Sequence, residues 1–147
     1  MTRRRKGRPN RGATAVELAI LLSCLFLLAV AFGVFDFALL FQRAAVVQDC
    51  AANGAAAGVA LGPSATEAAR DAAIRAVVDE IASPVGVAPI QKLSPLPTVT
   101  SSSGTDGQGF SYLEVTVTYT PDGSVGAIWS TGATPISRKV RLMMPPQ

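Results

Sequence analysis

The sequence predicts an α+β protein: a long N-terminal helix that spans a membrane and continues as an amphipathic stalk, a second helix, then a small antiparallel sheet. An uncharged apolar run, a later stretch of helical periodicity and two C-terminal stretches of alternating residues predict it. With 147 residues, the chain has room for one small domain beyond the membrane helix. We expect a basic cytoplasmic leader over residues 1–12, a transmembrane and stalk helix over residues 13–62, and an α+β head over residues 63–147.

The membrane helix is predicted by residues 18–35, which lie between Glu17 and Asp36 and include neither a charge nor a proline. As a helix rising about 1.5 Å per residue they span roughly 27 Å, close to the hydrocarbon thickness of a bilayer, about 30 Å. Lipid offers no hydrogen bonds to the backbone, so a helix is expected there. Thr14 and Glu17 have the T-x-x-E spacing of a capping box, which is a purely structural explanation of Glu17.

Beyond Asp36 the helical pattern continues and becomes amphipathic. Apolar or small residues recur on one face and polar residues on another; the apolar stripe is Leu40, Ala44, Val47, Ala51 and Gly54, and the polar stripe is Gln42, Asp49 and Asn53. Gly54 and Gly58 have the small-xxx-small spacing that allows two helices to approach closely, although a small-residue helix end explains them equally well. Gly62-Pro63 is expected to stop the helix.

A second helix is predicted after a capping-box signature, Ser64-Ala65-Thr66-Glu67, and before Ser83-Pro84. Its apolar face is expected to comprise Ala69, Ala73, Val77 and Ile81, and its solvated face Arg70, Asp71, Arg75, Asp79 and Glu80.

Two strands are predicted near the C-terminus, because apolar and polar residues alternate over residues 110–120 and 136–143. In the first strand the apolar positions are Leu113, Val115, Val117 and Tyr119, and in the second Ile136, Val140 and Leu142. Pro121-Asp122-Gly123 predicts a turn. Residues 84–109 are expected to be mostly loop, with short extended pieces near 85–90 and 98–101.

Charge is distributed unevenly along the chain. Residues 1–12 include six basic side chains and no acidic one, whereas the remainder has seven basic and ten acidic residues. A basic arm can bind nucleic acid, but an apolar span that follows at once favours a cytoplasmic flank under the positive-inside rule. We therefore expect a single-pass protein of the cytoplasmic membrane with its head outside, and no nucleic-acid partner.

The residue inventory argues against an enzyme. The chain has no histidine, no C-x-x-C pair, no cluster of metal ligands and no phosphate-binding motif. Cys24 and Cys50 would lie about 39 Å apart in one helix, too far for a disulfide. We expect no catalytic residue, metal or cofactor.

Taken together, several motifs are similar to the TadE-like family, pilin-like proteins of tight-adherence (Flp-type) pilus and secretion systems. They are the basic leader, Gly12, the segment Ala13-Thr14-Ala15-Val16-Glu17, the apolar run, Gly33-Val34-Phe35-Asp36-Phe37 and a stretch rich in Ala and Gly. The resemblance covers residues 11–58. The chain departs from the family pattern at Leu18, where an aromatic residue is common, and at Ala38-Leu39, where Gly-Arg is common.

The resemblance implies a minor pilin or pseudopilin that a prepilin peptidase cleaves between Gly12 and Ala13, which makes Glu17 the fifth residue of the mature chain. It also implies partners: the bilayer, that peptidase, other pilin-like subunits and the pilus assembly machinery. The candidate assembly residues are Glu17, Asp36, Gly54 and Gly58.

Two alternatives remain open at this point. Ala29-Val30-Ala31 has the A-x-A pattern of an ordinary signal-peptide cleavage site, which would release a secreted protein. A plain single-span anchor that presents a binding head is the other alternative. The three interpretations predict different N-termini: Ala13, Phe32, or an intact Met1 or Thr2.

Overall fold

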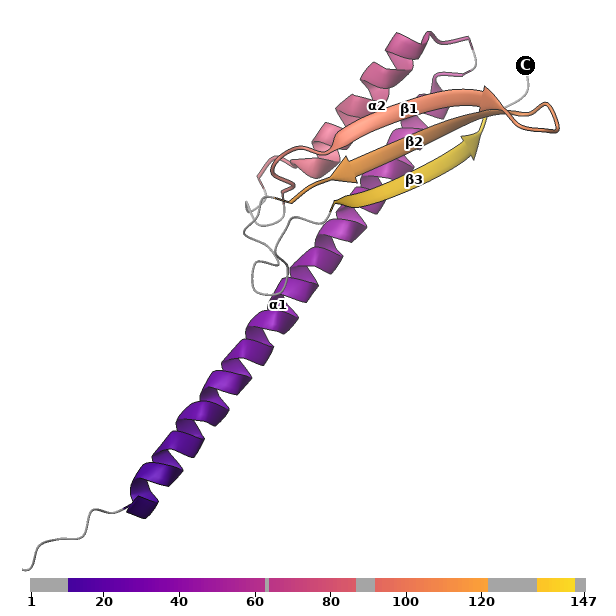
Figure 1. Cartoon of the computed structure of the whole chain (residues 1–147). Helices are drawn as coiled ribbons and strands as arrows, with labels where there is room; N and C mark the ends of the chain where they lie inside the picture. The colour runs from indigo at the N-terminus through magenta and orange to yellow at the C-terminus, as the bar shows by residue number, and fades with distance from the viewer. Residues whose placement is uncertain (1–10, 63, 87–91, 122–134, 145–147) are drawn as a thin grey trace, which may run out of the picture. The chain divides into compact units, whose positions relative to one another are not determined.

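The computed structural model describes residues 11–62, 64–86, 92–121 and 135–144. It forms two compact units, Met1–Phe35 and Asp36–Gln147, which we call the first and the second unit. The elements are helices α1 (Arg11–Ala60) and α2 (Glu67–Ala82) and strands β1 (Thr98–Thr105), β2 (Ser111–Tyr119) and β3 (Ile136–Met143) (Figure 1). The predicted α+β class is therefore confirmed, whereas most of the expected leader and the Asp122-Gly123 turn lie outside the described residues.

Helix α1 begins at Arg11, three residues before the threonine of the expected capping box. Thr14 therefore lies inside the helix, and the prediction that it starts the helix is wrong. At the other end Gly62 adopts φ +79° and its N–H donates to the Val59 carbonyl at 3.0 Å, so this glycine ends the helix as predicted.

Helix α2 is capped by Thr66, whose hydroxyl accepts a hydrogen bond from the Ala69 N–H at 3.2 Å. The predicted box, with Ser64 as the cap and Glu67 as its partner, is wrong: the chain is not yet helical at Ala65, and Glu67 is the first helical residue. A threonine hydroxyl on extended backbone can cap as well as a serine, so both residues were chemically competent.

The buried face of α2 comprises Arg70, Ile74, Val78 and Ala82, one residue along from the predicted stripe. Ala69 is exposed, and Ala73, Val77 and Ile81 are half-buried. A shift of one residue turns the face by about 100°. The larger Ile74 and Val78 side chains fit against Gly54 of α1, where a Cβ would lie 3.2 Å from a methyl carbon of each, and this fit decides which face turns inward.

The three strands form one antiparallel sheet in the order β1-β2-β3. In β2 the four predicted apolar side chains are all buried, and β3 has the predicted bounds. Strand β1 is longer than the extended piece expected near residues 98–101, since it runs to Thr105. Its Ser- and Thr-rich sequence shows no apolar alternation, and the pairing with β2, such as Val99 opposite Val117, supplies the register instead.

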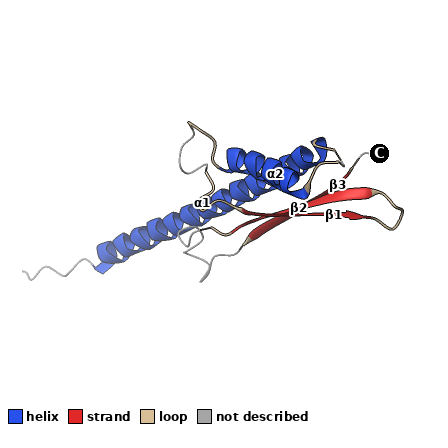
Figure 2. Cartoon of the chain, turned by 90° about the horizontal axis from the view of Figure 1, so that it is seen from above, coloured by secondary structure: helices blue, strands red, loops and turns tan. Residues whose placement is uncertain are grey.

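Within the second unit, α2 and the C-terminal part of α1 cover one face of the sheet, and no other described element covers the opposite face (Figure 2). The core lies between these layers. It consists of Val47, Cys50, Ala51 and Ala55 from α1, Ile74, Val78 and Ala82 from α2, Leu113, Val115, Val117 and Tyr119 from β2, and Leu93 and Met144. On α1, the predicted stripe is buried at Val47, Ala51 and Gly54 and half-buried at Leu40 and Ala44, and the predicted polar residues are exposed.

Gly58 is the tightest point of this core. A Cβ there would lie 2.5 Å from Leu113 Cδ2 and 3.0 Å from Ile74 Cδ1, and both of these side chains are themselves buried. Replacing Gly58 by Val should therefore lower the free energy of unfolding of the second unit by about 1–3 kcal/mol, the usual cost of overpacking. The urea midpoint at which the buried Cys50 thiol becomes reactive, measured in a Cys24→Ser background, reports the change.

Ala56→Val is the matched control, because Ala56 is exposed on the same helix and should tolerate the same side chain within about 0.5 kcal/mol. Equal midpoints for the two variants would contradict the close contact at Gly58.

Candidate functional site

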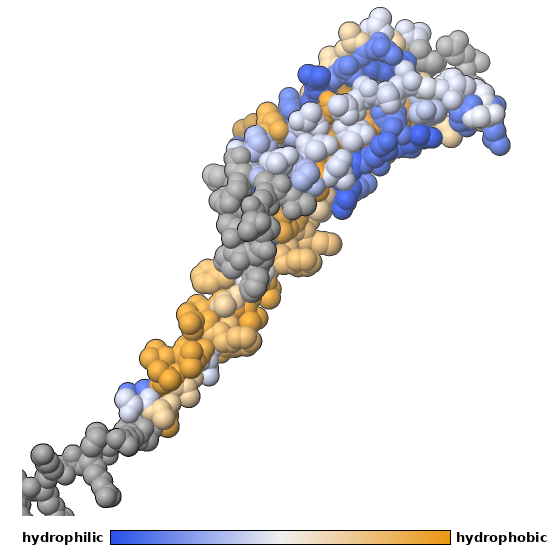
Figure 3. Space-filling view, in the orientation of Figure 1, coloured by the Kyte–Doolittle hydropathy of each residue, from blue (hydrophilic) through white to orange (hydrophobic). Residues whose placement is uncertain are grey.

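Most side chains of α1 in the first unit are apolar. Its large apolar side chains are largely exposed; they include Leu18, Leu21, Leu25, Phe26, Leu27, Phe32 and Val34. The mean hydropathy reaches 2.8 over eighteen residues, none of them buried (Figure 3). An exposed apolar surface of this extent is unusual for a soluble protein and requires an apolar environment. The helix is thus long and apolar enough to cross a membrane, a property that signal sequences share.

The polar Ser23 in this stretch satisfies its hydroxyl within the helix. Its Oγ donates to the Ala19 carbonyl at 2.8 Å, one turn earlier. A hydroxyl bonded to its own backbone has no unmet donor to expose to lipid. Ser23 is therefore compatible with a membrane environment.

The processing and charge motifs lie at the two limits of this segment. Gly12 and Ala13 are in the first turn of α1, and Glu17 is exposed about one turn further on. Asp36 directly follows the first unit and is half-buried. Among the described residues, neither carboxylate forms a hydrogen bond or an ion pair. Both carboxylates thus border the apolar stretch without a neutralising group among these residues.

The two glycines named as assembly residues are buried inside the second unit. Gly54 faces Ile74 and Val78, and Gly58 faces Leu113 and Ile74. They do allow close approach of two helices, but the helix that approaches is α2 of the same chain. Their role toward another subunit stays a prediction, and the structure does not gather the six named residues into one site.

Arg70 was expected on the solvated face of α2 but is only 6% exposed. Its Nη2 donates to the Gly62 carbonyl at 2.9 Å, which ties α2 back to the end of α1. The sequence does indicate that Arg70 is buried, because it lies one turn before Ile74 and two turns before Val78 on the same face of the helix. The prediction that Arg70 is exposed rests only on its charge.

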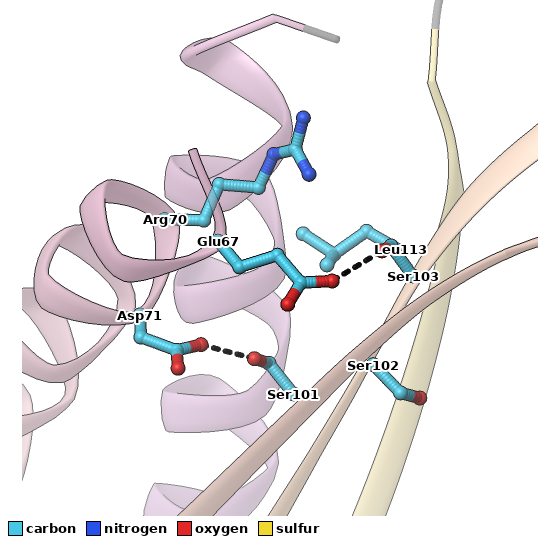
Figure 4. Close-up of a pocket in the computed structure, with 7 residues that line it drawn as sticks. All are labelled: Glu67, Arg70, Asp71, Ser101, Ser102, Ser103 and Leu113. Atoms are coloured by element: carbon cyan, nitrogen blue, oxygen red, sulfur yellow. Dashed lines mark hydrogen bonds between the residues drawn. The ribbon is translucent and has the colours of Figure 1, made fainter. Parts of the chain in front are cut away.

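A shallow pocket between α2 and β1 places carboxylates beside hydroxyls (Figure 4). The Ser103 hydroxyl donates to Glu67 Oε1 at 3.4 Å, and the Ser101 hydroxyl donates to Asp71. These bonds join the helix to the strand at the edge of the sheet. No group of three or more metal-ligating side chains occurs among the described residues. In the described structure these residues tie α2 to β1.

The uncovered face of the sheet carries a charge cluster that the sequence did not reveal. Glu114 on β2 pairs with Lys139 and Arg141 on β3, each at 2.9 Å, because the register places Arg141 opposite Glu114. The Lys139 hydrogen bond, followed by that of Arg141, lowers the pKa of Glu114. The Arg141 guanidinium also lies over the Tyr112 ring, 4.2 Å from its centroid.

The family model for TadE-like protein matches residues 12–56. Residues 12–56 are TadE-like. The match includes Gly12, Glu17, Asp36 and Gly54, and it confirms the resemblance inferred from the motifs. No curated protein and no solved structure matches the chain.

The TadE-like match gives a coarse functional conclusion. TadE-like proteins are structural or accessory components of pilus systems rather than enzymes. This match and the exposed apolar helix indicate a component associated with a tight-adherence pilus and anchored by one membrane-spanning helix.

The Glu114 cluster predicts part of the acid sensitivity of the second unit. A carboxylate whose pKa is lowered by folding stabilises the fold above the ordinary glutamate pKa, and this contribution is lost as pH falls through the lowered value. In the Glu114→Gln variant, the free energy of unfolding should therefore fall less steeply with decreasing pH between the ordinary glutamate pKa and the lowered one. The urea midpoint, followed by near-ultraviolet circular dichroism at a series of acid pH values, measures it.

Glu80→Gln serves as the control, since Glu80 is exposed on α2 and has no ion pair among the described residues. Parallel pH profiles for wild type and Glu114→Gln would show that the ion pairs contribute nothing measurable.

Proposed function

We propose that this protein is a minor pilin or pseudopilin of a tight-adherence pilus assembly or secretion system, processed after Gly12. The observation that carries the proposal is the TadE-like match, which begins at Gly12 and runs through the apolar helix. Its partners on this proposal are the lipid bilayer, a prepilin peptidase, other pilin-like subunits and the assembly machinery.

The proposed topology places the leader in the cytoplasm and the second unit outside the cytoplasmic membrane. Support comes from the six basic residues within residues 1–12 and from the net negative charge of the remainder. The exposed apolar side chains of α1 between these regions would then contact lipid until the subunit assembles.

Cleavage after Gly12 requires the scissile bond to enter a peptidase in an extended form. Gly12 lies in the first turn of α1, where the leading N–H groups have no intrahelical acceptor, so opening this turn breaks few hydrogen bonds. A glycine also has no Cβ to obstruct the cleft. The product would carry a new amine at Ala13, four residues before Glu17.

The signal-peptide alternative fits these observations less well. Ala29-Val30-Ala31 lies in the middle of α1, and cleavage there would divide the segment that matches the family. Large apolar side chains also continue beyond this site, through Val34 to Phe41.

A mass measurement of the chain extracted from membranes tests the processing. We expect an N-terminus at Ala13, and we expect Gly12→Leu to leave the precursor uncut because its side chain would obstruct the cleft. Gly7→Leu, in the same leader, is the control and should be cut normally. An N-terminus at Phe32 would establish the signal-peptide alternative, and an intact Met1 or Thr2 the plain anchor.

The charge of Glu17 is the basis of a second test. A carboxylate that is paired with an amine inside an apolar layer contributes through its charge, and losing one member of a buried pair costs about 3–5 kcal/mol, against about 1 kcal/mol for a lost helix cap. Because α1 begins at Arg11, the capping explanation of Glu17 has lost its support. Glu17→Gln should leave insertion, cleavage and abundance near normal and reduce co-purification with pilus subunits.

Asp49→Asn is the matched control, since it also removes a carboxylate from α1, on the exposed polar stripe. Normal assembly of Glu17→Gln at wild-type abundance would remove Glu17 from the functional residues.

A further inference from the structure

The uncovered face of the sheet is a candidate interaction surface of the second unit. Register places on this face alternate residues of each strand; they are Thr98, Thr100 and Ser102 of β1, Tyr112, Glu114, Thr116 and Thr118 of β2, and Ser137, Lys139, Arg141 and Met143 of β3. Short Ser and Thr side chains occupy β1 and part of β2 on this face, and the longer side chains lie mainly on β3. We call this set of residues the open sheet face (Figure 2).

The open sheet face combines apolar and basic groups. Met143 is 57% exposed, and Phe110, just before β2, is 54% exposed. The basic side chains of Lys139 and Arg141 are 61% and 52% exposed and outnumber the one acid, Glu114. Exposed aromatic residues, Met and Arg are enriched where proteins bind other proteins. The net positive charge of the open sheet face favours a partner surface that carries acidic groups.

The outward side of α2 has the complementary properties. It is lined by exposed alanines at Ala68, Ala69, Ala72 and Ala76, so another surface can approach closely. Among the exposed charged residues on this side, Asp79 and Glu80 outnumber Arg75. We call this side the α2 outer face.

These two faces lie on opposite sides of the second unit, because α2 packs on the face of the sheet that the open sheet face turns away from (Figure 2). One molecule therefore cannot bring them together, whereas two molecules can. We propose that the open sheet face of one copy docks on the α2 outer face of a second copy.

Contact between two different surfaces is heterologous, and it leaves one free surface of each kind on every pair. Copies can then be added in one direction without closure. This inference rests on the proposed function, in which the protein assembles with pilin-like subunits, and it names a surface for that assembly outside the membrane helix.

Disulfide cross-linking between two tagged copies expressed together tests the docking. One copy carries Thr116→Cys, at the centre of the open sheet face, and the other carries Ala76→Cys on the α2 outer face. Both carry Cys24→Ser, while the buried Cys50 is kept. We expect a mixed-tag disulfide dimer in membranes. The control pairs Thr116→Cys with Gln48→Cys, an exposed position of α1, and should give none.

Charge reversal supplies a second, independent measurement on the same cross-link. Lys139→Glu in the Thr116→Cys copy, or Asp79→Lys with Glu80→Lys in the Ala76→Cys copy, should each reduce the cross-link yield by about threefold, the size expected for exposed ion pairs. Combining them should restore the yield. Circular dichroism of each variant checks that the fold is retained.

Absence of the mixed dimer would overturn the proposal, as would a dimer formed only between two Thr116→Cys copies or only with a different protein. Failure to restore the yield in the combined variant would also overturn it. The docking and the processing can fail independently. A chain that cross-links but is not cut after Gly12 would support the docking and contradict the processing. A chain that is cut after Gly12 but does not cross-link would support the processing and contradict the docking.

Discussion

The second unit depends on the close approach of α2 to α1, which two glycines make possible. At Gly54 and Gly58 the backbone of α1 lies against Ile74, Val78 and Leu113, so that any side chain at these positions would displace core groups. This contact decides which side of α2 turns inward, and it lets β2 reach the same core. The Arg70 bond to the Gly62 carbonyl then fixes the turn between the two helices.

The sequence predicted well the elements whose patterns are set locally. The alternation in β2 and β3, the apolar run of α1 and the stop at Gly62 each follow from neighbouring residues, and each appears in the structure. The incorrect predictions concern elements whose structure depends on another element that packs or pairs with them. The buried side of α2 depends on where the glycines of α1 lie, and β1 becomes a strand because β2 pairs with it.

The candidate site divides in the same way. Gly12, Glu17 and Asp36 could be named because their meaning is local: they border an apolar run, and the family match includes them. The charge cluster of Glu114, Lys139 and Arg141 could not, because β2 and β3 are separate in sequence and only their register brings these groups together. A buried arginine such as Arg70 is likewise visible only once its acceptor is in place.

Among the described residues, the three-stranded sheet has two edges without a neighbouring strand, β1 and β3, in a protein that a membrane would concentrate in two dimensions. Such edges favour uncontrolled strand-to-strand aggregation between neighbouring molecules. Strand β3 carries three basic residues within four positions, Arg138, Lys139 and Arg141, and two such strands side by side would repel each other. Strand β1 is polar and includes Gly104, which lowers its strand propensity. The edges thus resist amyloid-like pairing without needing a covering element.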